Sequence, residues 1–185
     1  EWKEYWEAIG QDEERVSDFH ALVCMIAENR IVPELRNSIV GLRGKGIPSL
    51  RNDGTVKVRP ICVPEALMSL ATKALVRANY DDIVQVARTT RNNGAGTPCG
   101  TEITAICAAA HLSAHPDHCL IMLDKANAFN TIPRWAIAEG LQHFELQMFE
   151  PMFDLLYRGE LKVEFTDDSG GKHTQPILTG VMQGH

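Results

Sequence analysis

Apolar residues recur at helical spacing in two parts of the chain. Phe19, Val23 and Ile26 are three or four positions apart and follow Asp12, a residue type that often caps helix N-termini. A second helical pattern of leucines and alanines extends from residue 64 to about residue 87. We therefore expect helices on both sides of the segment that separates these two patterns.

The segment between them has a different pattern, in which apolar and polar residues alternate. Residues 47–50 and 56–61 flank a turn at residues 51–54 that contains Asp-Gly, so they predict a β-hairpin. Lys57 and Arg59 fall on the face of the second strand opposite its valines, which makes that face cationic. An ordinary solvated face is the alternative interpretation.

An unbroken apolar run, residues 120–123, ends at Asp124. Such a run predicts a strand buried on both faces, with the carboxylate at the rim of the sheet. Mg²⁺ prefers oxygen ligands and commonly binds through one or two protein carboxylates, so Asp124 is a candidate metal ligand. The alternative is that Asp124 caps the helix that follows.

The last third of the chain again mixes helical and strand patterns. Helices are predicted after Pro133 and over residues 147–157, and residues 161–165 and 174–178 predict a second hairpin. Strands from separated parts of the chain, with helices between them, favour an α+β fold. We expect an antiparallel sheet packed on helices.

Composition limits the classes of protein to consider. The chain has 185 residues, 44% hydrophobic and 23% charged, as in a globular domain, and no apolar stretch long enough to cross a membrane. Its five cysteines form no C-x-x-C motif and favour a reducing, intracellular location, nuclear or cytoplasmic. Because the chain begins at Glu1 and stops at His185 directly after a glycine loop, we expect a piece of a longer polypeptide.

Charge is unevenly distributed. The net charge of −6 argues against a protein coated in nucleic acid, but residues 36–59 contain six basic residues and one acidic residue. That strip suits a site that binds phosphates at one place. His111, His115 and His118 cluster around a proline, and we interpret them as part of a polar loop.

Four short motifs follow one another in an order known from one enzyme family. They are Arg-Pro-Ile at residues 59–61, Gly-Ala-Gly-Thr-Pro-Cys-Gly-Thr-Glu at 94–102, Leu-Asp to Phe-Asn at 123–130, and Gly-Val-Met-Gln-Gly at 180–184. In this order they resemble reverse transcriptases, most closely those of non-LTR retrotransposons. Each motif alone is weak, and the series is what makes the resemblance, which covers residues 47–185.

The resemblance implies a right-hand polymerase. Residues 1–46 would be an N-terminal helical segment, residues 47–112 the fingers with the basic hairpin, and residues 113–185 a partial palm. The implied activity is RNA-templated DNA synthesis by two-Mg²⁺ nucleotidyl transfer. Its partners would be an RNA template, a DNA primer, deoxynucleoside triphosphates and the rest of the polypeptide.

The resemblance also assigns roles to individual residues. Asp124 would bind both Mg²⁺ ions, and the carbonyl of Lys125 can bind one of them. Phe129, next to Ala128, would lie under the sugar and reject a ribose 2′-hydroxyl. The remaining residues would contact the incoming nucleotide, through its triphosphate or its base: Arg51, Lys57, Arg59, Gln183 and Gly184.

Departures from the family pattern leave alternatives open. The family's aromatic-x-Asp-Asp motif, which supplies further carboxylates, would lie beyond His185. Asp167-Asp168 is not a substitute, because it lies in a glycine turn that precedes the Gln-Gly loop. The fragment by itself is therefore expected to be inactive. A domesticated, non-catalytic binding or scaffold protein is one alternative. An RNA-dependent RNA polymerase is another, although Phe129 stands where such enzymes place an aspartate.

Overall fold

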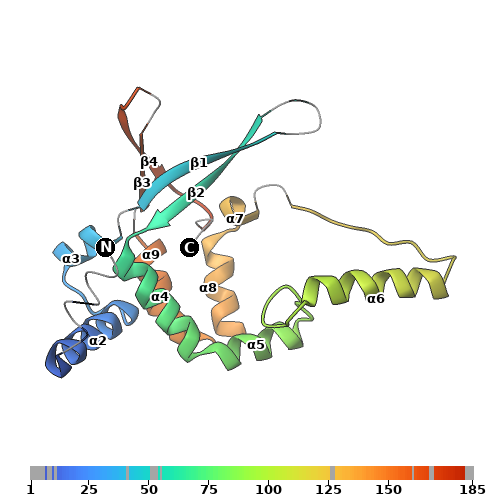
Figure 1. Ribbon diagram of the computed structural model, residues 1–185, viewed down its shortest axis with the longest axis horizontal. Helices are drawn as coiled ribbons and strands as arrows, with labels where there is room; N and C mark the ends of the chain where they lie inside the picture. Colours follow the sequence, from blue (N-terminus) through green and yellow to red (C-terminus); the bar gives the residue numbers. More distant parts are fainter. Residues whose placement is uncertain are drawn as a thin grey trace. The chain divides into compact units, whose positions relative to one another are not determined.

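The computed structural model describes residues 7, 10, 12–40, 42–50, 54, 56–125, 128–159, 161–166 and 169–181, and the fold of these residues is α+β, as predicted (Figure 1). The helices are α2 (Glu13–Ala27), α3 (Pro33–Ile39), α4 (Ala66–Ala78), α5 (Tyr80–Thr89), α6 (Gly100–Ala114), α7 (Ala128–Thr131), α8 (Arg134–His143), the 3-10 helix η1 (Gln147–Phe149) and α9 (Glu150–Tyr157). The strands are β1 (Leu42–Leu50), β2 (Val56–Pro64), β3 (Leu161–Thr166) and β4 (Lys172–Ile177). None of the described helices is long and apolar enough to span a membrane.

The four strands form one sheet in the order β2-β1-β3-β4. Both predicted hairpins are confirmed: β1 pairs with β2 and β3 with β4, each antiparallel. The hairpins meet where β1 and β3 run parallel, with Leu42 opposite Val163 and Arg43 opposite Glu164. The expectation of a purely antiparallel sheet is wrong at this junction, because strands distant in sequence can pair in either direction.

Helix α2 begins where the sequence predicts. The side chain of Asp12 accepts a hydrogen bond from the backbone N–H of Glu14 at 3.1 Å, which caps the helix. Glu13 and Glu14 in the first turn suit the positive end of the helix dipole. Val23 and Ile26 are the buried residues of this helix, in agreement with the apolar spacing.

The hydrophobic core combines the two ends of the chain. Among the residues that the structure describes, the largest fully buried side chains come from α2, α4, α9 and β3, and they are Ile26, Met68, Leu155 and Leu161. The strand side chain of Leu161 thus packs with helical side chains, so helices cover the sheet here, as predicted.

The chain divides into two compact units. Unit 1 contains residues Glu1–Leu75 and Phe129–His185, and unit 2 contains residues Val76–Ala128. These units do not follow the boundaries proposed after residues 46 and 112. The latter describe expected functional parts, fingers and palm, and they remain a prediction.

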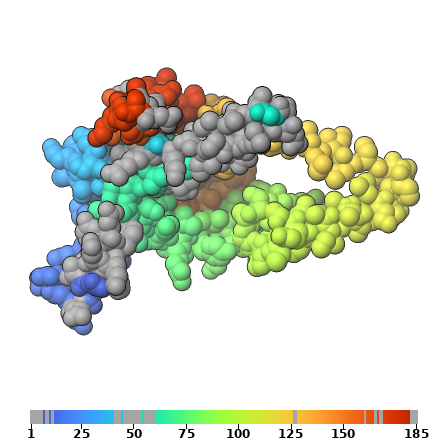
Figure 2. All heavy atoms as spheres, turned by 45° about the horizontal axis from the view of Figure 1, so that its top comes forward, coloured from blue at the N-terminus to red at the C-terminus, as the bar shows by residue number. Residues whose placement is uncertain are grey.

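Residues 120–123 do not form the buried strand that their apolar pattern predicts. Leu120 is 54% exposed and Leu123 is 92% exposed, and the segment has no regular secondary structure. Figures 1 and 2 show it leaving the end of α6 as a single extended chain. Within its own unit this run has no strand partner, because the described part of unit 2 contains helices and no strand with which the run could form hydrogen bonds.

Candidate functional site

The structure brings two of the sequence motifs into direct contact. The backbone N–H of Val181 donates a hydrogen bond to the carbonyl of Phe129 at 2.7 Å. The hydroxyl of Thr179 donates to the carbonyl of Asn130 at 3.3 Å. The loop after β4 is thereby attached to α7, although the two lie about fifty positions apart in the sequence. We call this contact, formed by residues 129–130 and 179–181, the α7–loop contact.

Gly180 allows the loop to approach the backbone of α7 closely. Its φ of +75° lies in the left-handed region that glycine adopts at little cost. A Cβ at this position would lie 2.4 Å from the carbonyl carbon and oxygen of Asn130, far inside van der Waals contact. Both its conformation and its neighbour therefore require glycine here.

Arg134, the first residue of α8, forms further hydrogen bonds to the same loop. Its guanidinium donates hydrogen bonds to the carbonyls of Ile177 at 2.7 Å, Gly180 at 3.0 Å and Tyr157 at 3.1 Å. It also lies 5.3 Å from the centre of the Tyr157 ring, within cation–π range. Burial lowers the pKa of this guanidinium and the nearby Tyr157 raises it, but an arginine stays charged at neutral pH.

Arg134 was not predicted from the sequence as a site residue, although the sequence contains a signal for it. A cation in the first turn of a helix faces the positive end of the helix dipole, and a carboxylate is the favoured residue there. An arginine directly after Pro133 therefore departs from the usual pattern of a helix start. Such a departure indicates that the side chain has partners elsewhere in the fold.

Phe129 presents its ring to solvent. The residue is 56% exposed, so it is not a core residue of the described structure. Ala128, the preceding predicted nucleotide contact, is exposed as well. Both residues are in α7, and the carbonyl of Phe129 is held by the loop. The backbone is thus fixed while the ring remains accessible to a ligand.

The two predicted metal-binding residues lie on the exposed segment before α7. Asp124 and Lys125 are exposed and belong to no helix or strand. The alternative that Asp124 caps the next helix is wrong, because α7 begins four positions later, at Ala128. Within the described ranges, no three His, Cys, Asp or Glu side chains are arranged to hold a metal ion.

The other predicted nucleotide contacts are described only in part. Lys57 and Arg59 are in β2, opposite Ser49 and Ile47 of β1, and the structure gives their backbone positions. The remaining three, Arg51, Gln183 and Gly184, lie outside the described residues. Lys57 and Arg59 both lie within β2, and the cationic face predicted for their side chains stays a prediction.

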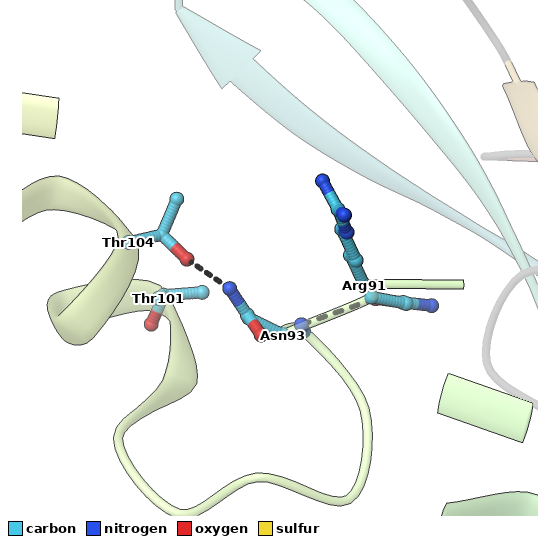
Figure 3. Close-up of a pocket in the computed structure, with 6 residues that line it drawn as sticks. Arg91, Asn93, Thr101 and Thr104 are labelled. Atoms are coloured by element: carbon cyan, nitrogen blue, oxygen red, sulfur yellow. Dashed lines mark hydrogen bonds between the residues drawn. The ribbon is translucent and has the colours of Figure 1, made fainter. Parts of the chain in front are cut away.

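Within unit 2, the glycine-rich motif at residues 94–102 forms a tight loop followed by the first residues of α6, which begins at Gly100. A Cβ on Gly100 would lie 1.8 Å from the carbonyl oxygen of Asn93, so the loop closes on itself around this glycine. The side-chain amide of Asn93 donates to the hydroxyl of Thr104 at 2.9 Å, which fixes the loop to the helix (Figure 3).

This loop borders an open hollow of about 330 Å³, lined by Arg91, Asn92, Asn93, Gly94, Thr101 and Thr104. One cation together with amide and hydroxyl groups makes the lining suitable for an anionic ligand such as a phosphate.

Three histidines gather at the end of α6. The Nε2 atom of His111 and the Nδ1 atom of His118 are 2.9 Å apart, so one ring donates a hydrogen bond to the other. The rings of His115 and His118 stack with their centres 4.8 Å apart. These contacts close the turn that follows the helix.

Comparisons of this chain with protein families, curated proteins and solved structures find no match. The roles of the site residues therefore rest on the sequence motifs and on the geometry described above.

Proposed function

We propose that this chain is part of an RNA-directed DNA polymerase, a reverse transcriptase of the retrotransposon type, with residues of its fingers and partial palm. The observation that supports this most directly is the α7–loop contact. The motif that ends in Phe129-Asn130 and the motif that begins at Gly180 are the two that would flank the incoming nucleotide. The hydrogen bond from Val181 to Phe129 joins them.

The chain's residues suit phosphoryl transfer, in which the protein contributes mainly positioning and charge. Lys57 and Arg59, with Arg51 at the hairpin turn, would neutralise the triphosphate. Phe129 would exclude a 2′-hydroxyl by its bulk. These residues act through charge and shape, so none of them needs to form a covalent bond with the substrate.

Asp124 and the carbonyl of Lys125 would hold the metal ions. The exposed carboxylate is a hard oxygen donor of the type that Mg²⁺ takes, and it is free of the helix-cap role. Two bound Mg²⁺ ions would activate the primer 3′-hydroxyl and stabilise the leaving pyrophosphate. One carboxylate and one carbonyl form an incomplete donor set, so further carboxylates are needed for tight binding.

The test is primer extension by the polypeptide that the complete reading frame around this chain encodes. With an RNA template, a DNA primer, deoxynucleotides and Mg²⁺, we expect DNA synthesis that Asp124→Asn abolishes. The matched control is Asp117→Asn, which removes another exposed carboxylate of unit 2 and should leave synthesis unchanged. Full activity of Asp124→Asn would exclude Asp124 from the site.

A second candidate function is a non-catalytic binding protein derived from the same fold. The observation that favours it is the position of Asp124 on an exposed segment instead of at the end of a paired strand. In that case the complete polypeptide would bind RNA without Mg²⁺ and extend no primer. Extension with ribonucleotides in place of deoxynucleotides would instead identify an RNA-dependent RNA polymerase.

A further inference from the structure

We infer that Arg134 is a positioning residue of the proposed nucleotide site, an inference that rests on the proposed function. Three carbonyls from separate segments converge on its guanidinium: that of Tyr157 at the end of α9, that of Ile177 at the end of β4, and that of Gly180 in the loop. The side chain thus joins the loop to two elements of unit 1.

The arrangement requires an arginine. A different nitrogen serves each carbonyl: Nε donates to Gly180, Nη1 to Tyr157 and Nη2 to Ile177. The planar guanidinium presents donors in several fixed directions, whereas a lysine has a single ammonium group on a flexible stem. A lysine at this position therefore keeps the charge but cannot reach all three carbonyls together.

Residues 129–134 contact the loop both through backbone carbonyls and through the side chain of Arg134. Phe129 and Asn130 accept hydrogen bonds from Val181 and Thr179, and Arg134 donates to Gly180 four positions further along. These bonds fix the backbone of the loop from Thr179 to Val181 relative to Phe129. Loss of Arg134 would free the loop and weaken the mutual placement of the residues that contact the sugar and base.

The first test measures the loop directly and needs no catalytic activity. Amide hydrogen exchange of the 185-residue chain would be compared for the parent, Arg134→Lys and Arg134→Met. Exchange at Val181 should accelerate by about 10- to 100-fold in both variants, the factor that corresponds to loss of a charge-assisted hydrogen bond. Protection at Ile26 in the core should stay unchanged.

The matched control is Arg158→Met, which removes an exposed arginine that pairs with Asp154 on α9. Exchange at Val181 should be unaffected by it. Parent-like protection of Val181 in Arg134→Met would overturn the inference. So would loss of protection at Ile26 in both Arg134 variants, because Arg134 would then support the whole fold instead of the loop.

The second test uses the complete polypeptide in primer extension. Both Arg134 variants should raise KM for deoxynucleotides and accept ribonucleotides more readily, and Arg134→Lys should not restore the parent values. Loss of loop protection with unchanged kinetics would refute the positioning role while leaving the proposed function intact. A parent that extends no primer under any condition would refute the proposed function itself, whatever the exchange data show.

Discussion

At the scale of single residues, the exposure of Phe129 bears on its role. An aromatic residue that follows an apolar run can either pack into the core or contact a ligand. Such a residue commonly packs into a core, but here the residue is more than half exposed. An exposed ring on a fixed backbone can contact a ligand, and its bulk can exclude one added hydroxyl group. Substitution of Phe129 should therefore change substrate choice more than stability.

The first prediction follows from this exposure. In the complete polypeptide, Phe129→Ala should increase the relative use of ribonucleotides over deoxynucleotides by about tenfold or more, because a smaller side chain leaves room for the 2′-hydroxyl. The measurement is kcat/KM for matched ribo- and deoxynucleotides in primer extension. Phe144→Ala, at the exposed end of α8, is the control and should leave the ratio unchanged. Equal discrimination in Phe129→Ala and parent would contradict the role of Phe129.

At the scale of elements, the α7–loop contact depends on a glycine in two separable ways. Gly180 and Gly170 both have positive φ, at +75° and +86°. A Cβ on Gly170 would meet nothing within 4 Å, whereas one on Gly180 would collide with the backbone of Asn130. The pair therefore separates the cost of the backbone conformation from the cost of the collision.

The second prediction uses that pair. Gly170→Ala should lower the free energy of unfolding by about 1 kcal/mol, the cost of a left-handed conformation for a non-glycine residue. Gly180→Ala should either lower it by a further 1–3 kcal/mol, roughly the cost of overpacking, or displace the loop. Urea unfolding measures the first outcome, and amide exchange at Val181 measures the second. Equal effects of both substitutions, with Val181 still protected, would show that the collision is relieved without consequence.

The sequence predicted local features such as helix starts and turns correctly, but it did not predict which distant segments contact one another. Asp12 and the apolar spacing after it correctly located α2, and the Asp-Gly turn correctly located the hairpin of β1 and β2. Both signals are local, since capping and turn chemistry act over a few residues. The strand predicted at residues 120–123 failed because an apolar pattern does not specify a partner for the backbone.

In the candidate site, too, local motifs were predictable from the sequence and contacts between distant residues were not. Phe129 and the glycine loop were found from motifs, and the structure joins them by a hydrogen bond. Arg134 was missed because its three acceptors are backbone carbonyls, which every residue has and which the sequence therefore cannot distinguish. Only the fold determines that these three carbonyls converge.

At the scale of the whole molecule, the cysteines differ in how far they are exposed to solvent. Cys62 is buried in the core of unit 1, and burial raises the pKa of its thiol. Cys99, Cys107 and Cys119 in unit 2 are exposed. A thiol that is both inaccessible and protonated reacts slowly with alkylating reagents, because the thiolate is the nucleophile.

The third prediction concerns this contrast. At neutral pH, iodoacetamide should modify Cys99, Cys107 and Cys119 within the time in which Cys62 remains unmodified, and urea should make Cys62 react as well. Peptide mass spectrometry after quenching identifies each site. Cys62→Ala serves as the control that identifies the late-reacting thiol. Modification of Cys62 as fast as the exposed thiols, without denaturant, would show that the core of unit 1 is open.

The discontinuity of unit 1 has a consequence for synthesis on the ribosome. Ile26 and Met68 pack with Leu155 and Leu161, and β1 pairs with β3, so the first part of the unit lacks its partners until the last part has been made. At ordinary translation rates this interval is on the order of 10 s. The nascent chain exposes the apolar faces of α2 and α4 throughout that time, which makes it a substrate for chaperones. Contacts between residues so far apart in the chain also slow folding after release.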